Sequence, residues 1–112
     1  MIKGFFTLIY SVLLKAIMDE LQQLVNKFVS DRDWDQFHAP VHLAKSIVIE
    51  SAELLECFQC DNDHFDHQHV KEELADVMIY CLQMCDKLGV RADGIIKMSE
   101  EKYPVEKVKG KK

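Results

Sequence analysis

The chain has 112 residues, of which 48% are hydrophobic and 29% are charged, and its formal net charge at pH 7 is −5. This length and composition predict one globular domain with a single core and exclude an intrinsically disordered chain. The negative charge argues against a protein that grips a nucleic-acid backbone, but it is compatible with a free nucleotide bound through a metal ion.

The N-terminal segment, residues 1–17, is strongly apolar. A lysine followed by an apolar run is typical of a signal peptide, but Leu14-Lys15-Ala16 is a poor cleavage site and the run is too short to span a bilayer. Three interpretations stay open: an extra helix used in oligomerisation, a loosely anchored arm, or an extension before a functional start at Met18. We expect an extra apolar helix or arm that packs against a second subunit.

From Met18 onward, apolar residues recur at helical spacing, and polar clusters with Gly or Pro separate the segments. Asp66 is expected to cap the third helix, and Gly89 is expected to end it. The predicted helices are residues 18–30, 40–60, 67–88 and 92–102. They predict an all-α protein of the four-helix-bundle type, with a basic, flexible tail over residues 105–112.

All four cysteines fall within the predicted helices. This placement favours reduced, mostly buried thiols of a cytoplasmic protein over a disulfide-linked scaffold. A zinc site is the alternative, because Cys57-x-x-Cys60 is followed by His64-x-x-His67. The helix that continues through Cys57 and the lack of a second Cys-x-x-Cys argue against zinc.

Two pairs of acidic residues stand on the second and third predicted helices: Glu50 with Glu53, and Glu73 with Asp76. A spacing of three residues places both carboxylates of a pair on one side of a helix. No lysine or arginine stands three or four positions from any of the four acids. Unpaired carboxylates on semi-apolar faces are costly unless a cation joins them, so we expect a divalent metal ion there.

Helices joined by short loops pack antiparallel, so the two acid pairs are expected to face each other across a groove. A cluster of carboxylates suits Mg²⁺ or Mn²⁺, which prefer oxygen ligands, and Mg²⁺ commonly shares its coordination shell with substrate phosphates. Two alternatives are solvated surface acids and a di-iron site. A di-iron site would need Glu-x-x-His on two helices, and the chain has no such triplet.

These acids and their surroundings resemble the MazG-like all-α nucleoside triphosphate pyrophosphohydrolases, whose signature is a Glu-x-x-Glu helix followed by a Glu-x-x-Asp helix. The resemblance covers about residues 18–110 and extends to the dCTP pyrophosphatase branch of that family. The segments that carry it are Arg32–Pro40, Leu43–Gln59, Glu73–Tyr80 and Lys102–Lys107. We therefore expect residues 18–104 to form a MazG-like domain that follows an N-terminal extension.

The resemblance implies Mg²⁺-dependent hydrolysis of a (deoxy)nucleoside triphosphate to the monophosphate and pyrophosphate. The expected substrate is a pyrimidine dNTP such as dCTP, and the expected role is sanitation of the nucleotide pool. By the same resemblance, Mg²⁺, or alternatively Mn²⁺, would be held by four acids, of which Glu53 is also the candidate catalytic base. These implied metal ligands are Glu50, Glu53, Glu73 and Asp76.

The resemblance also implies the substrate-binding residues. Trp34, His38 and Tyr80 match positions that line the nucleoside pocket in the branch, where aromatic faces stack on a base and polar atoms contact its edge or the sugar. Lys97 and Lys102 are candidates for binding the phosphates.

Four helices in a chain of 112 residues cannot enclose a nucleotide well, so we expect a homo-oligomer. The family implies a homodimer or homotetramer in the cytoplasm, with a nucleoside triphosphate as partner and without a nucleic-acid or membrane partner. Ser99 departs from the family, because many relatives have Asn four residues before the Tyr-Pro pair. The alternative functions are a non-catalytic helical module that binds nucleotides or a protein, and a membrane-attached protein anchored by residues 1–17.

Overall fold

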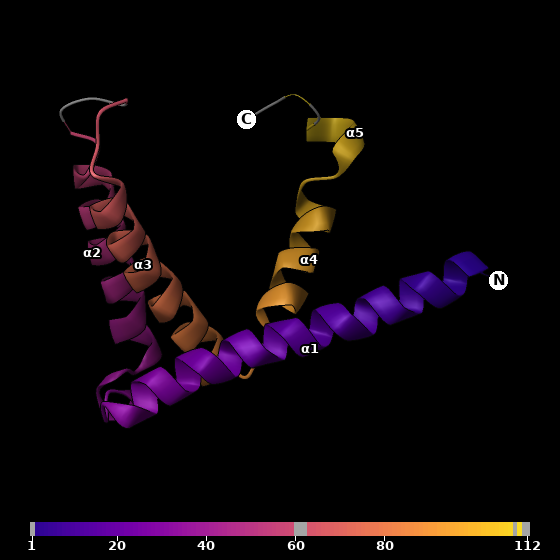
Figure 1. The fold of residues 1–112 in the computed structure, drawn as a ribbon, viewed down its shortest axis with the longest axis horizontal. Helices are drawn as coiled ribbons and strands as arrows, with labels where there is room; N and C mark the ends of the chain where they lie inside the picture. Colours follow the sequence, from indigo (N-terminus) through magenta and orange to yellow (C-terminus); the bar gives the residue numbers. More distant parts are fainter. Residues whose placement is uncertain (1, 60–62, 109, 111–112) are drawn as a thin grey trace.

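A computed structural model describes residues 2–59, 63–108 and 110 of the chain. Within these residues all the regular structure is helical, which confirms the predicted all-α fold. Four long helices dominate, and a short 3-10 helix and a terminal helical turn complete the chain (Figure 1). The elements are α1 (Ile2–Asp31), η1 (Asp35–Phe37), α2 (Pro40–Glu56), α3 (His67–Leu88), α4 (Ala92–Lys102) and α5 (Val105–Val108).

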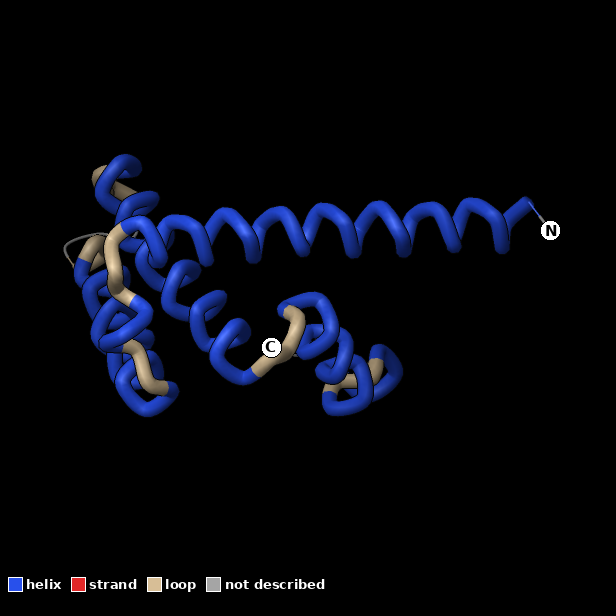
Figure 2. Tube along the Cα trace, turned by 90° about the horizontal axis from the view of Figure 1, so that it is seen from below, coloured by secondary structure: helices blue, strands red, loops and turns tan. Residues whose placement is uncertain are grey.

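Helix α1 is continuous over 30 residues, so the expected boundary between residues 17 and 18 lies inside a single helix. Its C-terminal half carries the buried Val25 and Val29, which pack with Leu82 of α3. The amide of Gln22 also donates a 2.8 Å hydrogen bond to the Leu82 carbonyl. The N-terminal half of α1 extends beyond the other helices and leaves its apolar side chains exposed (Figure 2).

The chain turns sharply between α1 and α2 within a few residues (Figure 1). Asp33 has a φ of +53°, in the left-handed region that aspartate tolerates better than most residues. After η1, Pro40 occupies the first turn of α2, where its missing N–H costs no hydrogen bond. This turn brings Trp34 and His38 next to α3.

Helices α2 and α3 run antiparallel and side by side, as predicted (Figure 1). Helix α2 ends at Glu56, four residues before its predicted end, because the chain turns over residues 57–59. Helix α3 has its predicted bounds: the Asp66 carboxylate accepts hydrogen bonds from the amides of Gln68 and His69, and Gly89 ends the helix with a φ of +66°. Both terminal signals in the sequence are therefore confirmed.

Helix α4 also has its predicted bounds, but it stands apart from the α2–α3 pair and packs mainly against α1 (Figure 1). Arg91, just before α4, lies 3.8 Å from the Asp19 carboxylate of α1. The predicted flexible tail begins with the helical turn α5, and positions 109, 111 and 112 of that tail lie outside the described residues.

The single chain is open. Its radius of gyration is 17.4 Å, whereas a compact domain of this length has about 13 Å. Its accessible surface is 9176 Å², against about 6,300 Å² expected for a compact monomer of this mass. The chain therefore leaves unburied an area comparable to a sizeable protein interface.

Much of this surplus surface is apolar. A groove of about 390 Å³ between α1, α3 and α4 is lined by Met18, Leu21, Met78, Cys81, Leu82, Cys85, Ala92, Ile95 and Ile96. Cys81 is exposed there, so the prediction of mostly buried thiols is wrong for this residue, while Cys85 is buried. We call this surface the apolar groove. Despite its apolar α1, the described part of the chain contains no helix that meets the length and hydropathy needed to cross a membrane.

Candidate functional site

Three of the four predicted metal ligands lie together between α2 and α3. One carboxylate oxygen from each of Glu50, Glu73 and Asp76 lies within 4.8 Å of the other two. Opposite ligands of an octahedral Mg²⁺ are about 4.2 Å apart, so a small inward movement would let one ion contact all three acids. We call these residues the carboxylate trio.

The electrostatics of the trio fit a cation. The pKa of Glu50 is raised from 4.5 to about 7, first by burial and then by hydrogen bonding and repulsion from Glu53, with Asp76 and Glu73 adding to the effect. One side-chain oxygen of Glu50 and one of Glu73 are buried and have no hydrogen-bond partner among the described residues. Buried carboxylate oxygens without a hydrogen-bond donor are suited to coordinate a metal ion, because the ion is smaller than a water molecule.

Glu53 lies beside the trio and outside it. It stands one turn after Glu50 on α2 and shares a side-chain hydrogen bond with that residue, but its own side chain is exposed. A carboxylate that contacts a metal ligand and also faces solvent can receive a proton from a water molecule.

The imidazole of His69 contacts the trio. Its Nε2 lies 3.2 Å from Glu73 Oε1, one turn along α3. Among the described residues, no lysine or arginine forms an ion pair with the trio. The clustered negative charge is therefore balanced within the described chain by His69 at most.

The raised pKa of Glu50 predicts a pH-dependent stability of the metal-free protein. Folding moves this pKa from 4.5 to about 7, so the folded state holds the proton more tightly than the unfolded state. The resulting stabilisation is complete below about pH 4.5 and is lost as the pH rises through about 7. We expect the Tm of EDTA-treated protein to fall from pH 5 to pH 8, and Mg²⁺ to raise it more at pH 8.

Differential scanning calorimetry measures both effects, and Glu50→Gln is the matched control because it cannot titrate. This variant should show a smaller fall in Tm over the same range. An equal fall in the variant and the parent protein would assign the pH dependence to other groups.

An aromatic pocket adjoins the trio. It has a volume of about 220 Å³ and is lined by Phe28, Trp34, Glu50, Asp76, Ile79 and Tyr80. Two members of the trio thus share one cavity with two of the predicted base-binding residues. Trp34 is 40% exposed and packs edge-to-face on Phe28 at 5.6 Å between ring centroids. Its indole is held on one side and open to a ligand on the other.

Tyr80 lines this pocket, and His38 packs against Tyr80. Burial and the carboxylates of Glu50, Asp76 and Glu53 raise the pKa of Tyr80, which keeps its hydroxyl protonated as a hydrogen-bond donor. His38 lies behind Tyr80, and the two rings meet edge-to-face at 5.7 Å between centroids. His38 therefore contacts the pocket through Tyr80.

The predicted phosphate-binding lysines lie elsewhere. Lys97 and Lys102 are exposed on α4, the helix that stands apart from α2 and α3. The ammonium of Lys102 lies 5.2 Å from the centre of the Tyr103 ring. Within one chain, the structure does not bring these lysines to the carboxylate trio.

The sequence analysis did not assign Phe28 or Ile79 to the site, although both line the aromatic pocket. An apolar position on a helix looks the same in the sequence whether it faces a core or a pocket, so neither residue carried a signal.

The comparisons with known proteins identify relatives of the chain. The MazG-like family profile matches residues 45–112, which include all four acids. The rat protein dCTP pyrophosphatase 1 is 30% identical over 106 residues, and the human protein of that name is 32% identical over 82 residues. The match to the rat protein covers 83% of this chain and 62% of the rat protein, so the chain spans about three fifths of that relative.

A solved structure gives the same result at the level of the fold. The crystal structure of a pyrophosphatase from Archaeoglobus fulgidus superposes with a TM-score of 0.62 and 36% identity, over 78% of this chain and 92% of the archaeal one. The profile match over more than half of the chain, together with these relatives, confirms the resemblance read from the sequence: this chain belongs to the MazG-like family.

Proposed function

We propose that the protein is a Mg²⁺-dependent nucleoside triphosphate pyrophosphohydrolase that converts a (d)NTP to the (d)NMP and pyrophosphate. One observation carries the proposal: Glu50 and Asp76 belong to the carboxylate trio and also line the pocket that holds Trp34 and Tyr80. A cation-binding cluster thus opens onto an aromatic cavity, which suits a ligand with a phosphate end and a base end. The names of the relatives, dCTP pyrophosphatase 1 and pyrophosphatase, support the same chemistry.

In this proposal Glu50, Glu73 and Asp76 hold the metal. When bound, Mg²⁺, or Mn²⁺ in its place, supplies positive charge that offsets the charge of the triphosphate and lowers the pKa of water. Glu53, exposed beside Glu50, accepts the proton of the attacking water. The water oxygen bonds to phosphorus as the P–O bond between the α and β phosphates breaks, which leaves the monophosphate and pyrophosphate.

We infer a pyrimidine dNTP, such as dCTP, as the preferred substrate. The name of the curated relatives supports dCTP. The pocket volume of about 220 Å³ favours a small base, since it lies below the range of about 300–1,000 Å³ that is usual for whole ligands. Trp34 and Tyr80 would contact the base, and His38 would support Tyr80 through the contact between their rings. Hydrolysis of such nucleotides would sanitise the cytoplasmic pool.

The protein acts as a homo-oligomer, a homodimer or homotetramer, in this proposal. The open chain with its large accessible surface, the exposed apolar half of α1 and the apolar groove support a second copy as their partner. The partner subunit would close the small pocket. It would also offer a route by which Lys97 and Lys102, remote from the trio in one chain, could reach the phosphates.

The substrate class is tested by incubating the protein with each dNTP and NTP in the presence of Mg²⁺. We expect equimolar monophosphate and pyrophosphate, with dCTP turned over fastest, and no release of inorganic phosphate. Chromatography of the nucleotides and an assay for pyrophosphate without added pyrophosphatase measure both products. A folded protein that binds nucleotides in calorimetry but releases no pyrophosphate from any of them would support the non-catalytic module instead.

A further inference from the structure

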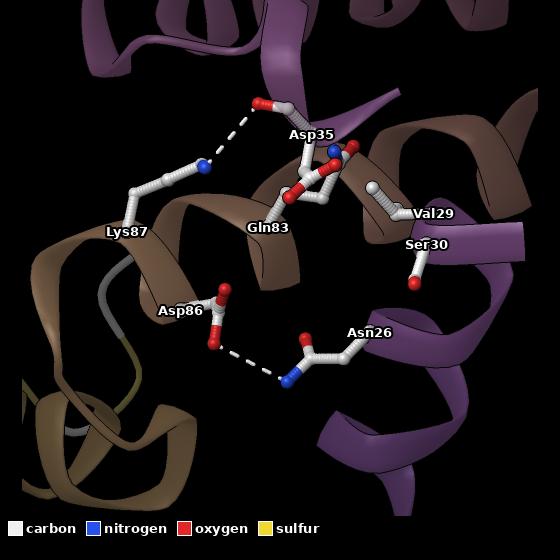
Figure 3. A pocket seen from close by; sticks show the side chains of 7 residues that line it. All are labelled: Asn26, Val29, Ser30, Asp35, Gln83, Asp86 and Lys87. Carbon is white, nitrogen blue, oxygen red and sulfur yellow. Dashed lines mark hydrogen bonds between the residues drawn. The ribbon is translucent and has the colours of Figure 1, made fainter. Parts of the chain in front are cut away.

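Gln83 is a buried polar side chain to which the proposed function assigns no role. It is 4% exposed and lies on α3, one turn after Tyr80. It stands in the wall of a polar cavity of about 210 Å³ between the end of α1, η1 and α3 (Figure 3). Burial of an amide costs free energy unless the amide forms hydrogen bonds, so the hydrogen-bond partner of Gln83 indicates its role.

The amide of Gln83 makes a hydrogen bond to the imidazole of His38. The Gln83 Nε2 is the partner of His38 Nδ1. The amide presents its Nε2 to the ring, and in this orientation Nε2 donates and Nδ1 accepts. Nδ1 accepts only when it carries no proton, so this orientation corresponds to a neutral His38 with its proton on Nε2.

The charged groups around His38 favour the same neutral form. Burial, Lys87 of α3 and His42 of α2 lower the pKa of His38, while Asp35 of η1 opposes them. Lys87 is held close by a 3.3 Å hydrogen bond from its ammonium to the Asp35 carbonyl (Figure 3). The neutral ring is thus maintained by the groups on the three elements that surround it.

A continuous set of contacts joins Gln83 to the aromatic pocket. The His38 ring meets the Tyr80 ring edge-to-face, and Tyr80 lines the pocket with Trp34 and Glu50. We propose, building on the proposed function, that Gln83 is a positioning residue that fixes the His38 ring and its Nε2–H tautomer, and thereby holds Tyr80 in place for the nucleoside.

The direct test is ¹⁵N NMR of the histidine side chains in the native protein, with no substrate present. We expect Nδ1 of His38 to be unprotonated at pH 7.5 and Nε2 to carry the proton. Gln83→Glu replaces the donor with an acceptor, so it should move the proton to Nδ1 and raise the pKa of His38 by about one unit or more. A proton on Nδ1 in the parent protein would overturn the proposal without any variant.

Kinetics test the consequence for the substrate. Gln83→Met keeps the size of the side chain and removes the donor, and we expect it to raise KM for the dNTP about five- to tenfold with kcat changed less than about twofold. Gln68→Met is the matched control, because Gln68 is exposed on the same helix and bonds to Glu72. An unchanged KM in Gln83→Met, or an equal change in the control, would reject the positioning role.

The two experiments separate this inference from the proposed function. A protein that hydrolyses no nucleotide but shows the expected tautomer and its reversal in Gln83→Glu would retain the Gln83–His38 assignment and lose the enzyme assignment. An active enzyme with the other tautomer would do the reverse.

Discussion

Replacing Asp76 with asparagine, or Glu73 with glutamine, is expected to lower the rate of pyrophosphate release at least about a thousandfold, because a catalytic metal lowers the activation free energy by several kcal/mol. Each change removes one charge from the carboxylate trio, whose oxygens lie within 4.8 Å of one another. Affinity for Mg²⁺ should fall as well. Turnover of dCTP and isothermal titration with Mg²⁺ measure the two effects.

The same variants should be more stable than the parent protein when no metal is present. Burial and Glu53 are the main causes of the raised pKa of Glu50, and repulsion from Asp76 and Glu73 adds to it, so neutralising either of these two acids relieves part of the repulsion in the metal-free state. We expect a higher Tm in EDTA, together with an unchanged helical circular dichroism spectrum. Loss of activity with gain of stability is typical of a functional site and separates a metal ligand from a core residue.

Glu72→Gln is the matched control for Glu73→Gln. Glu72 precedes Glu73 on α3, but it is exposed and pairs with Gln68 at 3.2 Å. It should leave both turnover and Mg²⁺ affinity unchanged. Full activity in Asp76→Asn, or an equal loss in Glu72→Gln, would remove the trio from the mechanism.

If the proposed homo-oligomer buries the apolar groove, substitution of Ile96 with aspartate is expected to convert it to a monomer. Ile96 lines the apolar groove and is 66% exposed in the single chain, so an aspartate there would cost a lone subunit little. If a second copy covers the groove, the change loses about 1.5–3 kcal/mol of apolar burial per site and leaves a charge to be desolvated. The dissociation constant should therefore rise at least about a hundredfold.

Sedimentation equilibrium over a range of concentrations measures this effect, and turnover should fall at concentrations where subunits separate. Gln23→Asp, an exposed polar position on α1, is the control that adds the same charge elsewhere. A parent protein that is monomeric and active at every concentration would contradict the proposed assembly.

Local signals in the sequence were sufficient for much of the fold. The bounds of α3 and α4 follow from the Asp66 cap, Gly89 and the Tyr103-Pro104 pair, because each of these acts on the adjacent backbone alone. The end of α2 was predicted too late, since residues 57–59 are compatible with a helix and only the loop to α3 makes them turn. The sequence does not predict that α4 stands apart from α2 and α3, because this separation depends on the direction that the chain takes after Gly89.

The site was predictable to the extent that it depends on helical spacing. Glu50, Glu73 and Asp76 meet because fixed spacing and antiparallel packing bring one face of α2 to one face of α3. The contact between His38 and Gln83 joins residues 45 positions apart and depends on the turn at Asp33, which helical spacing does not predict. The roles assigned to all the predicted site residues stay predictions, and the structure shows only which of these residues lie together.

Helix α1 joins two regions of unequal local stability within one uninterrupted hydrogen-bonded rod. Its C-terminal half is anchored by Val25 and Val29, whereas its first turns are exposed, and helical segments of about a dozen residues are marginal in water when nothing packs against them. Backbone amides of residues 6–14 should therefore exchange with solvent far faster than those near Val25 in an isolated subunit. Association would slow exchange at residues 6–14 and leave exchange near Val25 unchanged. The exchange rates along α1 would therefore report the fraction of the protein that is assembled.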